Sequence, residues 1–321
     1  MNCRPILLFL LLISTAVHAS AQVSGCTDPQ ALNYDSLAIM NDGSCMYPST
    51  STVPIKMVRS LPLELRETSG LIFWNYSLWT HNDSGGEPAL YKLDTLTGKV
   101  LQKVTLVNAL NIDWEEIAQD DSFIYIGDFG NNLGTRKDLK VYVVSKTEVP
   151  FNKDGEVTAS VINFSYADQQ SYTMANRSND YDCEAMVTYG DSLYLFTKNW
   201  ANQQSRLYAL PKTPGTYSVY PIDTLAADGL ITGADLSPSG NELVLCGYKN
   251  YSPIVWVLYD YRNGFFFKGN KRRINFSGMT GTQTEGAAFL RESEVVISSE
   301  KTTISPAGLF KINISPWTKS N

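Results

Sequence analysis

The chain has 321 residues, of which 43% are hydrophobic and 12% aromatic, enough to bury a sizeable core. Its 26 basic and 32 acidic residues give a net charge of −6, and no basic stripe is present, which argues against a nucleic-acid partner. Beyond the N-terminal stretch, no apolar run reaches the length of a membrane span, so no transmembrane segment is predicted.

Residues 1–21 have the pattern of a secretory signal peptide. Arg4 supplies the positive start, Ile6–Ile13 the apolar stretch, and Ala19–Ala21 a small-residue cleavage site. The pattern predicts an exported protein that is secreted or held in the periplasm or cell envelope.

Export would place the cysteines that follow in an oxidising compartment, where disulfides form. Cys26 and Cys45 bracket a compact segment, residues 22–45, and are predicted to pair with each other. Cys183 and Cys246 are predicted to be buried or bonded to each other. The oxygen-rich side chains between the first two cysteines fit two interpretations, a Ca²⁺ site or turn capping. They are Asp28, Asn33, Asp35, Asn41 and Asp42.

The segment Gly25–Cys45 resembles a GCTDP…NY…DGSC module of exported proteins of Bacteroidota. The likeness rests on GCTDP, Ala31, Asn33-Tyr34, Ala38 and DGSC. It implies a bacterial cell-envelope or extracellular setting and no catalysis.

Residues 46–52 (MYPSTST) are predicted to be a linker, and residues 53–317 a β-propeller domain. The prediction rests on five copies of a strand–turn–strand pattern that start 46 to 69 residues apart, the spacing of propeller blades. The first strands begin at Ser69, Glu115, Glu184, Thr232 and Glu285. Second strands follow at 78–80, 123–126, 193–196, 243–245 and 295–297, and third strands at 90–93, 140–143, 207–210, 255–258 and 309–312. The fold is therefore all-β with five blades, and the longest spacing leaves room for a sixth.

The last repeat supplies only three clear strands, although a ring of blades must close to protect its sheet edges. Val53–Val58 is predicted to close the ring as the outer strand of the last blade. Residues 163–182 are predicted to form a long surface loop, and Gly264–Arg273 an outer strand followed by a basic turn.

In a propeller, the starts of the first strands and the ends of the second strands meet at one mouth of the central channel. Carboxylates gather at the strand starts, and like charges near one axis repel unless they are protonated, paired or bridged by a cation. The candidate ligands of a Ca²⁺ ion are Glu115, Glu184, Glu285, Asp113 and Asp182. The alternative is that Lys198 and Lys301 neutralise these charges. Ligand-binding candidates at the same mouth are Asn82, Asp83, Asp128, Asn131, Asn132, Lys198, Asn199 and Lys301.

Only two histidines occur, and His18 belongs to the predicted signal peptide. His81, within WTHNDSG, is therefore the single candidate for a catalytic base, although a lone loop histidine more often serves as a hydrogen-bonding residue. Zinc motifs built from several histidines and the G-x-S-x-G nucleophile motif are absent from the sequence.

The stretches SGL…WTHNDSG…LY, DWEEIA…YIGDFGNN and TEGAAF resemble exported propellers of the SdiA-regulated and esterase-like-phytase families. The resemblance spans about residues 60–316 and implies a propeller whose channel mouth carries acidic residues and calcium. Glu115, Glu184 and Glu285 match the pattern, whereas Ser69 and Thr232 depart from it.

Two functions fit these features. One is a binding module that presents the acidic, calcium-binding mouth to a glycan, peptide or small molecule. The other is a Ca²⁺-dependent hydrolase of an ester, lactone or phosphoester, in which the ion polarises a substrate oxygen. The shortage of a base and a nucleophile favours binding. The oligomeric state is left open.

Overall fold

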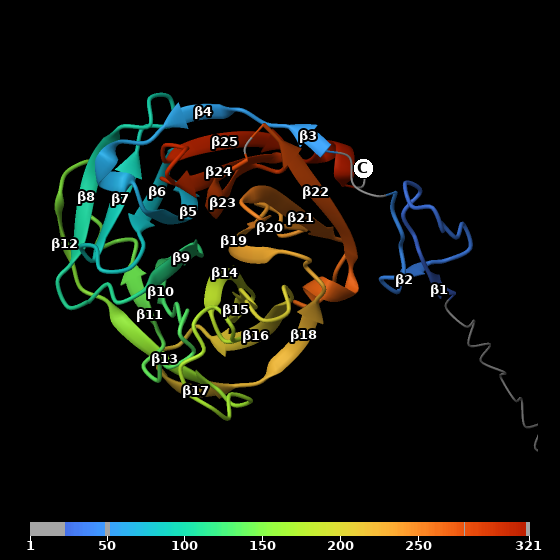
Figure 1. Ribbon diagram of the computed structural model, residues 1–321, viewed down its shortest axis with the longest axis horizontal. Coiled ribbons are helices and arrows are strands. Elements are labelled where there is room, and N and C mark those ends of the chain that lie inside the picture. The colour runs from blue at the N-terminus through green and yellow to red at the C-terminus, as the bar shows by residue number, and fades with distance from the viewer. Residues whose placement is uncertain (1–22, 49–51, 279, 319–321) are drawn as a thin grey trace, which may run out of the picture.

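The computed structural model describes residues 23–48, 52–278 and 280–318, so the predicted signal peptide lies outside the described residues. The protein is a five-bladed β-propeller, with the blades arranged around a central axis (Figure 1). The regular helices of the described part are short 3-10 turns, η1 (Leu63–Leu65), η2 (Phe266–Lys268) and η3 (Ser315–Trp317). No helix in these ranges is long and apolar enough to cross a membrane.

Each blade has four antiparallel strands, and every strand predicted within the repeats is present. The innermost strands are β5 (Thr68–Trp74), β9 (Trp114–Gln119), β14 (Cys183–Tyr189), β19 (Leu230–Leu236) and β23 (Gln283–Arg291). The second strands are β6 (Ser77–Asn82), β10 (Phe123–Asp128), β15 (Ser192–Thr197), β20 (Glu242–Lys249) and β24 (Glu294–Glu300). The third strands are β7 (Ala89–Leu93), β11 (Lys140–Ser145), β16 (Ser205–Pro211), β21 (Ser252–Tyr259) and β25 (Gly308–Asn313). The fourth strands are β8 (Val100–Leu106), β13 (Ser160–Tyr166), β18 (Pro221–Leu225), β22 (Asn270–Ser277) and β4 (Met57–Ser60).

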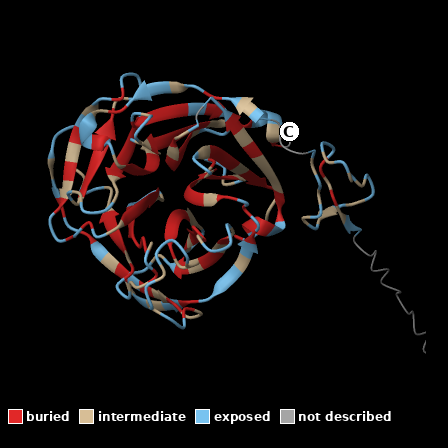
Figure 2. Cartoon of the chain, in the orientation of Figure 1, coloured by how far each residue is buried: buried red, intermediate tan, exposed pale blue. Residues whose placement is uncertain are grey.

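The hydrophobic core lies between neighbouring blades. Strands near the axis are covered on both faces, so β6 and β7 are buried along nearly their whole length, whereas β8 alternates between buried and less buried residues. Figure 2 shows this gradient from a buried centre to an exposed rim. Between blades 1 and 2, for example, Trp79 of β6 and Trp114 of β9 belong to one buried cluster.

The ring closes through the N-terminal part of the domain, as predicted, but with two strands rather than one. β4 pairs antiparallel with β25 and completes blade 5. The preceding strand, β3 (Thr52–Pro54), instead pairs parallel with β22 at the outside of blade 4. The segment 53–58 is therefore divided between two blades.

The same arrangement recurs at two more places in the ring, and the described residues form five blades. β12 (Gly155–Val157) precedes the outer strand of blade 2 but pairs parallel with β8 of blade 1. β17 (Gly215–Val219) precedes the outer strand of blade 3 but pairs parallel with β13 of blade 2. Each added strand thus covers the edge of the preceding blade, and β12 together with the loop 167–182 accounts for the longest repeat spacing.

The prediction for Gly264–Arg273 is wrong. The Phe run forms η2, in which Phe266 and Phe267 are buried in the cluster between blades 3 and 4, and the basic residues belong to β22. At this place the short helix η2 contacts β18, the outer strand of blade 3, whereas the outer strands of blades 1, 2 and 4 each pair with an added strand.

The N-terminal module contains the short parallel pair β1 (Ser24–Gly25) and β2 (Met40–Asn41) and the predicted Cys26–Cys45 disulfide. Its Asp and Asn side chains cap turns: Asp35, Asn41 and Asp42, for example, each accept a hydrogen bond from a backbone N–H two residues further on. Asp28 Oδ1 accepts from the backbone N–H of Gln30 in the same way, but Asp28 is buried and its Oδ2 accepts from Tyr259 of the propeller. Cys183 and Cys246 are free and buried.

Candidate functional site

The acidic residues gather at the mouth where the innermost strands begin. Adjacent blades bring these strand starts together around the axis, at the centre of Figure 1. The carboxylates that influence one another's charge there are Asp83, Asp113, Glu115, Asp182, Glu184, Glu285 and Glu300. We call this set the acidic cluster. All five predicted metal ligands belong to it.

Two groups within the acidic cluster are close enough to hold a metal ion. Asp83, Asp113 and Glu115 form one group, and Glu115, Asp182 and Glu184 form the other. In each group, one oxygen from every carboxylate lies within 4.8 Å of the others. Because Glu115 belongs to both, the two groups are continuous, and the strand starts of blades 2 and 3 supply most of the donors.

Burial and mutual repulsion raise the pKa values of these carboxyl groups. The pKa of Asp113 rises to about 7 through burial and the charges of Asp83 and Asp182. Burial, Asp83 and Glu184 raise the pKa of Glu115 well above its usual range. Burial raises the pKa of Glu285 to about 7 and, together with Glu285, that of Glu300 to about 8. The cluster therefore holds more negative charge than its surroundings stabilise.

Lys198 is the cation that pairs with this cluster. Its Nζ lies 3.0 Å from Glu184 Oε1, and both side chains are buried. Burial alone would lower the pKa of Lys198, but Glu184, Tyr248, Glu285 and Asp182 together outweigh burial and raise this pKa well above its usual range. A lysine therefore neutralises one carboxylate of the cluster, that of Glu184, as the alternative interpretation predicted. Lys301 is exposed and has no ion pair within the described residues.

The residues of the mouth fit a hard cation. The donor set consists of carboxylate oxygens, which Ca²⁺ and Mg²⁺ prefer, and contains no sulfur or imidazole. The backbone also leaves room, because a Cβ on Gly130 would lie 2.2 Å from Glu115 Oε1 and 2.5 Å from Asp113 Oδ2. In addition, Asp128 Oδ2 is a buried oxygen with no hydrogen-bond partner in the described part of the chain.

Several predicted ligand-binding residues are used to build the loops around the mouth. Asp128 forms an ion pair with Arg136, with Nη2 2.9 Å from Oδ1. Asn131 donates its backbone N–H to Asp182 and its side-chain amide to Tyr181 O. The backbone oxygen of Asn132 and the side chain of Asn199 likewise serve local hydrogen bonds. Of these residues, Asp128 and Asn131 bond members of the acidic cluster directly, through the backbone N–H of Asp113 and the carboxylate of Asp182.

His81 has the surroundings of a core residue. It is fully buried, its Nδ1 lies 3.0 Å from Asn82 O, and its ring meets Trp114 edge-on at 5.6 Å. Burial lowers the pKa of His81 to about 4, so the ring is neutral at pH 7. Its neighbour Asn82 donates to Glu64 O and accepts from Asn111, which fixes the loop that carries Asp83.

Glu116 and Glu300 are buried or partly buried acidic residues of the channel that were not predicted as site residues. Glu116 is fully buried and reaches across the axis, where Oε2 accepts from the backbone N–H of Ala234 in blade 4 at 2.8 Å. A Cβ on Gly70 would lie 2.4 Å from Glu116 Oε1, so glycine is required beside it. The signal was present in the sequence as the second Glu of DWEEIA and as the Ser-Gly, Thr-Gly and Glu-Gly strand starts.

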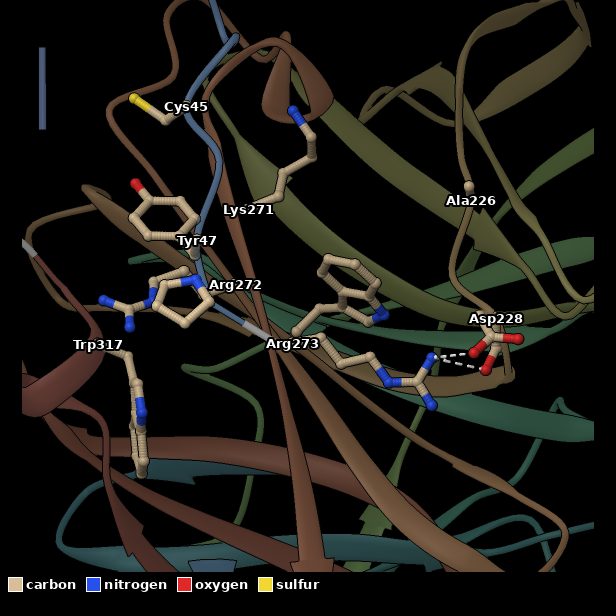
Figure 3. A pocket seen from close by; sticks show the side chains of 10 residues that line it. Cys45, Tyr47, Ala226, Asp228, Lys271, Arg272, Arg273 and Trp317 are labelled. Atoms are coloured by element: carbon tan, nitrogen blue, oxygen red, sulfur yellow. Dashed lines mark hydrogen bonds and ion pairs between the residues drawn. The ribbon is translucent and has the colours of Figure 1, made fainter. Parts of the chain in front are cut away.

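A separate cavity of about 520 Å³ lies where the N-terminal module meets blade 4 (Figure 3). Its basic side chains already have partners. Lys271 donates to Phe267 O and Gly269 O, Arg272 stacks on Tyr47, and Arg273 pairs with Asp228. The cavity is thus a junction built from satisfied contacts.

No known family model matches the sequence, and no curated protein matches it. Three solved structures show how distant the similarities of fold are. A candidate 6-phosphogluconolactonase from Bacteroides uniformis matches with a TM-score of 0.38 and 13% identity over 87% of this chain and 73% of its own. Hydrazine synthase from Kuenenia stuttgartiensis matches with a TM-score of 0.38 and 11% identity, over 84% of this chain and 67% of its own. A glucose dehydrogenase matches with a TM-score of 0.47 and 9% identity, over 81% of this chain and 99% of its own.

These matches say nothing about what this chain binds. The resemblances to the SdiA-regulated and esterase-like-phytase families and to the GCTDP module stay predictions. The fold and the site define a five-bladed β-propeller with a buried carboxylate cluster at one mouth of its channel.

Proposed function

We propose that the protein is an exported binding module whose acidic cluster holds a calcium ion. The observation that carries the proposal is that two sets of three carboxylate residues share Glu115. In each set, the candidate ligand oxygens lie within 4.8 Å of one another. Three carboxylates drawn together in a buried place repel one another, and a divalent cation removes that repulsion. The Cys26–Cys45 disulfide is consistent with the oxidising compartment that export would supply.

Binding is proposed ahead of hydrolysis because of His81. This residue was the single candidate for an imidazole base, and it is fully buried against Trp114. When bound, the calcium ion would orient the oxygens of a ligand and offset their charge. Asp83, Asp113, Glu115, Asp182 and Glu184 would hold the ion, while Arg136, Asn131 and Trp200 fix the carboxylates in place.

The test is calcium-dependent stability. An ion that binds only the native state stabilises it by about 2.7 kcal/mol at a hundredfold excess over Kd. We expect a chelator to lower the melting temperature and added Ca²⁺ to restore it. Glu115→Gln keeps the shape of the side chain but removes the charge shared by both groups, so it should abolish most of the response.

Glu156→Gln is the matched control, because Glu156 is exposed on β12 at the rim of the ring. It should respond to Ca²⁺ as the unchanged protein does. A calcium response that survives in Glu115→Gln would place the ion elsewhere, and a protein that ignores both chelator and Ca²⁺ would refute the proposal.

A further inference from the structure

A small cavity opens at the rim of the acidic mouth, between blades 3 and 4. It has a volume of about 150 Å³ and shares Asn250, Tyr251 and Gln283 with a wider hollow of about 900 Å³ beside it. We call it the rim cavity. Arg177, Trp200, Tyr248, Lys249, Tyr251 and Gln283 line it.

The wall of the rim cavity is bonded directly to the acidic cluster. Trp200 Nε1 donates to Asp182 Oδ2 at 2.7 Å, and Gln283 Nε2 lies 3.4 Å from Glu285 Oε1. Lys198, the partner of Glu184, has its Nζ 4.8 Å from the centre of the Trp200 ring and 5.7 Å from that of Tyr248. A molecule in the rim cavity would therefore lie beside the proposed calcium site.

Positive charge stands at the entrance to the rim cavity. The guanidinium of Arg177 lies 5.2 Å from the Trp200 ring centre, on an exposed residue whose φ is 48°. A hydrogen bond from the Arg177 backbone N–H to Asn132 O, 2.9 Å long, holds this left-handed turn in place. Lys249 lines the same cavity and pairs with Asp228, which is itself mostly exposed. Cations at this entrance favour an anionic ligand.

Aromatic and amide groups accompany these cations. The rings of Tyr248 and Tyr251 are stacked, with centroids 5.9 Å apart and planes at 12°, and Tyr251 is half exposed. Aromatic rings offer flat apolar faces to the C–H groups of a sugar ring, and amides such as those of Asn250 and Gln283 hydrogen-bond hydroxyl groups. The combination suits a ring that carries hydroxyls and one negative group.

We propose that the rim cavity binds an anionic sugar. Its ring packs against Tyr251, its hydroxyls meet Asn250 and Gln283, and its charged group lies at Arg177 and Lys249. The inference deepens the proposed function, on which it rests, by naming the class of ligand. The negative group can be a carboxylate or a phosphate, because both pair with guanidinium.

The experiment is calorimetric titration of the full chain with glucuronate, glucose 6-phosphate and glucose, in Ca²⁺ and again in chelator. We expect at least one anionic sugar to bind at least tenfold more tightly than glucose, and the tighter of the two identifies the charged group. Arg177→Gln should weaken that binding about tenfold. Lys99→Gln removes one charge from an exposed turn between β7 and β8 at the other end of the blades, and should leave binding unchanged.

The outcomes separate this inference from the calcium site. Calcium binding measured by titration should be the same in Arg177→Gln as in the unchanged protein. Sugar binding that persists although Ca²⁺ does not bind would support the rim cavity and refute the calcium site. Normal Ca²⁺ binding without sugar binding, equal affinity for glucose and the anionic sugars, or no effect of Arg177→Gln would overturn the inference.

Discussion

Asp28 is the buried residue among those of the N-terminal module that hydrogen-bond the propeller; Thr27 and Asn41 also do so. Its Oδ2 accepts hydrogen bonds from Tyr259 of blade 4 at 2.5 Å and from Tyr47 at 2.7 Å, and its side chain is fully buried. The other interpretation of the sequence, a calcium ligand within the module, is not needed to explain it. The GCTDP motif therefore supplies a docking contact at its Asp.

Asp28→Asn should weaken the hydrogen bonds between the module and the propeller and lower the free energy of unfolding. The substitution keeps the shape but replaces the oxygen that accepts both tyrosine hydroxyls, and one lost buried hydrogen-bonding arrangement costs about 1–3 kcal/mol. Urea denaturation measures the change in the free energy of unfolding. Asp42→Asn is the control, because Asp42 caps an exposed turn of the same module. Equal stabilities for the two variants would show that Asp28 does not hold the module.

At the scale of single residues, the sequence predicted which strand starts carry charge, but not which neighbouring side chains point to the axis. Glu115, Glu184 and Glu285 could be placed at one mouth because each begins an innermost strand. Glu116 could not, because whether the neighbouring Glu points to the axis depends on the β-bulge between β9 and β10, which shifts their register. The burial of His81 could not be predicted from the sequence, because it depends on Trp114 of the next blade.

At the level of strands, the repeat pattern predicted all the inner strands, since the same strand–turn–strand pattern recurs in every blade. The added strands β12 and β17 were not predicted, and β3 was predicted only as part of a single strand, Val53–Val58, in the last blade. These added strands are three to five residues long, with mixed burial, and each pairs with the edge strand of a neighbouring blade. The pattern of apolar residues in a strand indicates which of its faces is buried, but it does not indicate the sheet with which the strand pairs.

Removing the closing strand should open the ring. A chain that starts at Ser51 loses the module and the Asp28 contacts but keeps β3 and β4. A chain that starts at Leu61 also loses β4, so that β25 becomes an exposed edge. We expect the first to remain monomeric with a lowered melting temperature, and the second to aggregate or to lose its cooperative transition. Size-exclusion chromatography and thermal melts compare them.

Equal behaviour of the two truncated chains would show that β4 is dispensable. The chain that starts at Ser51 also serves as the control for loss of the module, because both chains lack it.

For the whole molecule, the acidic cluster should make stability depend on pH. The pKa values of Asp113 and Glu285 are raised to about 7 and that of Glu300 to about 8, so the folded protein holds protons that the unfolded chain releases near pH 4. Without a cation, stability should be greatest below about pH 4 for these groups and should fall as the pH rises through 7 to 8.

Calcium should remove this fall, because the ion favours the deprotonated carboxylates. Melting temperatures recorded between pH 5 and 8, in chelator and in Ca²⁺, test the expectation. In chelator we expect a decrease of several degrees towards pH 8, and in Ca²⁺ a flat or rising profile. A decrease of the same size in both conditions would show that no cation reaches the cluster.

The closure of the ring by β4 also sets an order of assembly during synthesis. The ribosome makes β4 before any of the blades, yet its partner β25 is the last strand of the domain. Blade 5 therefore cannot be completed until nearly the whole chain has emerged, and a contact this distant in sequence forms slowly. Until then β4 has no partner, so a chain interrupted before Gly308 exposes an unpaired strand that quality-control proteases and chaperones can recognise.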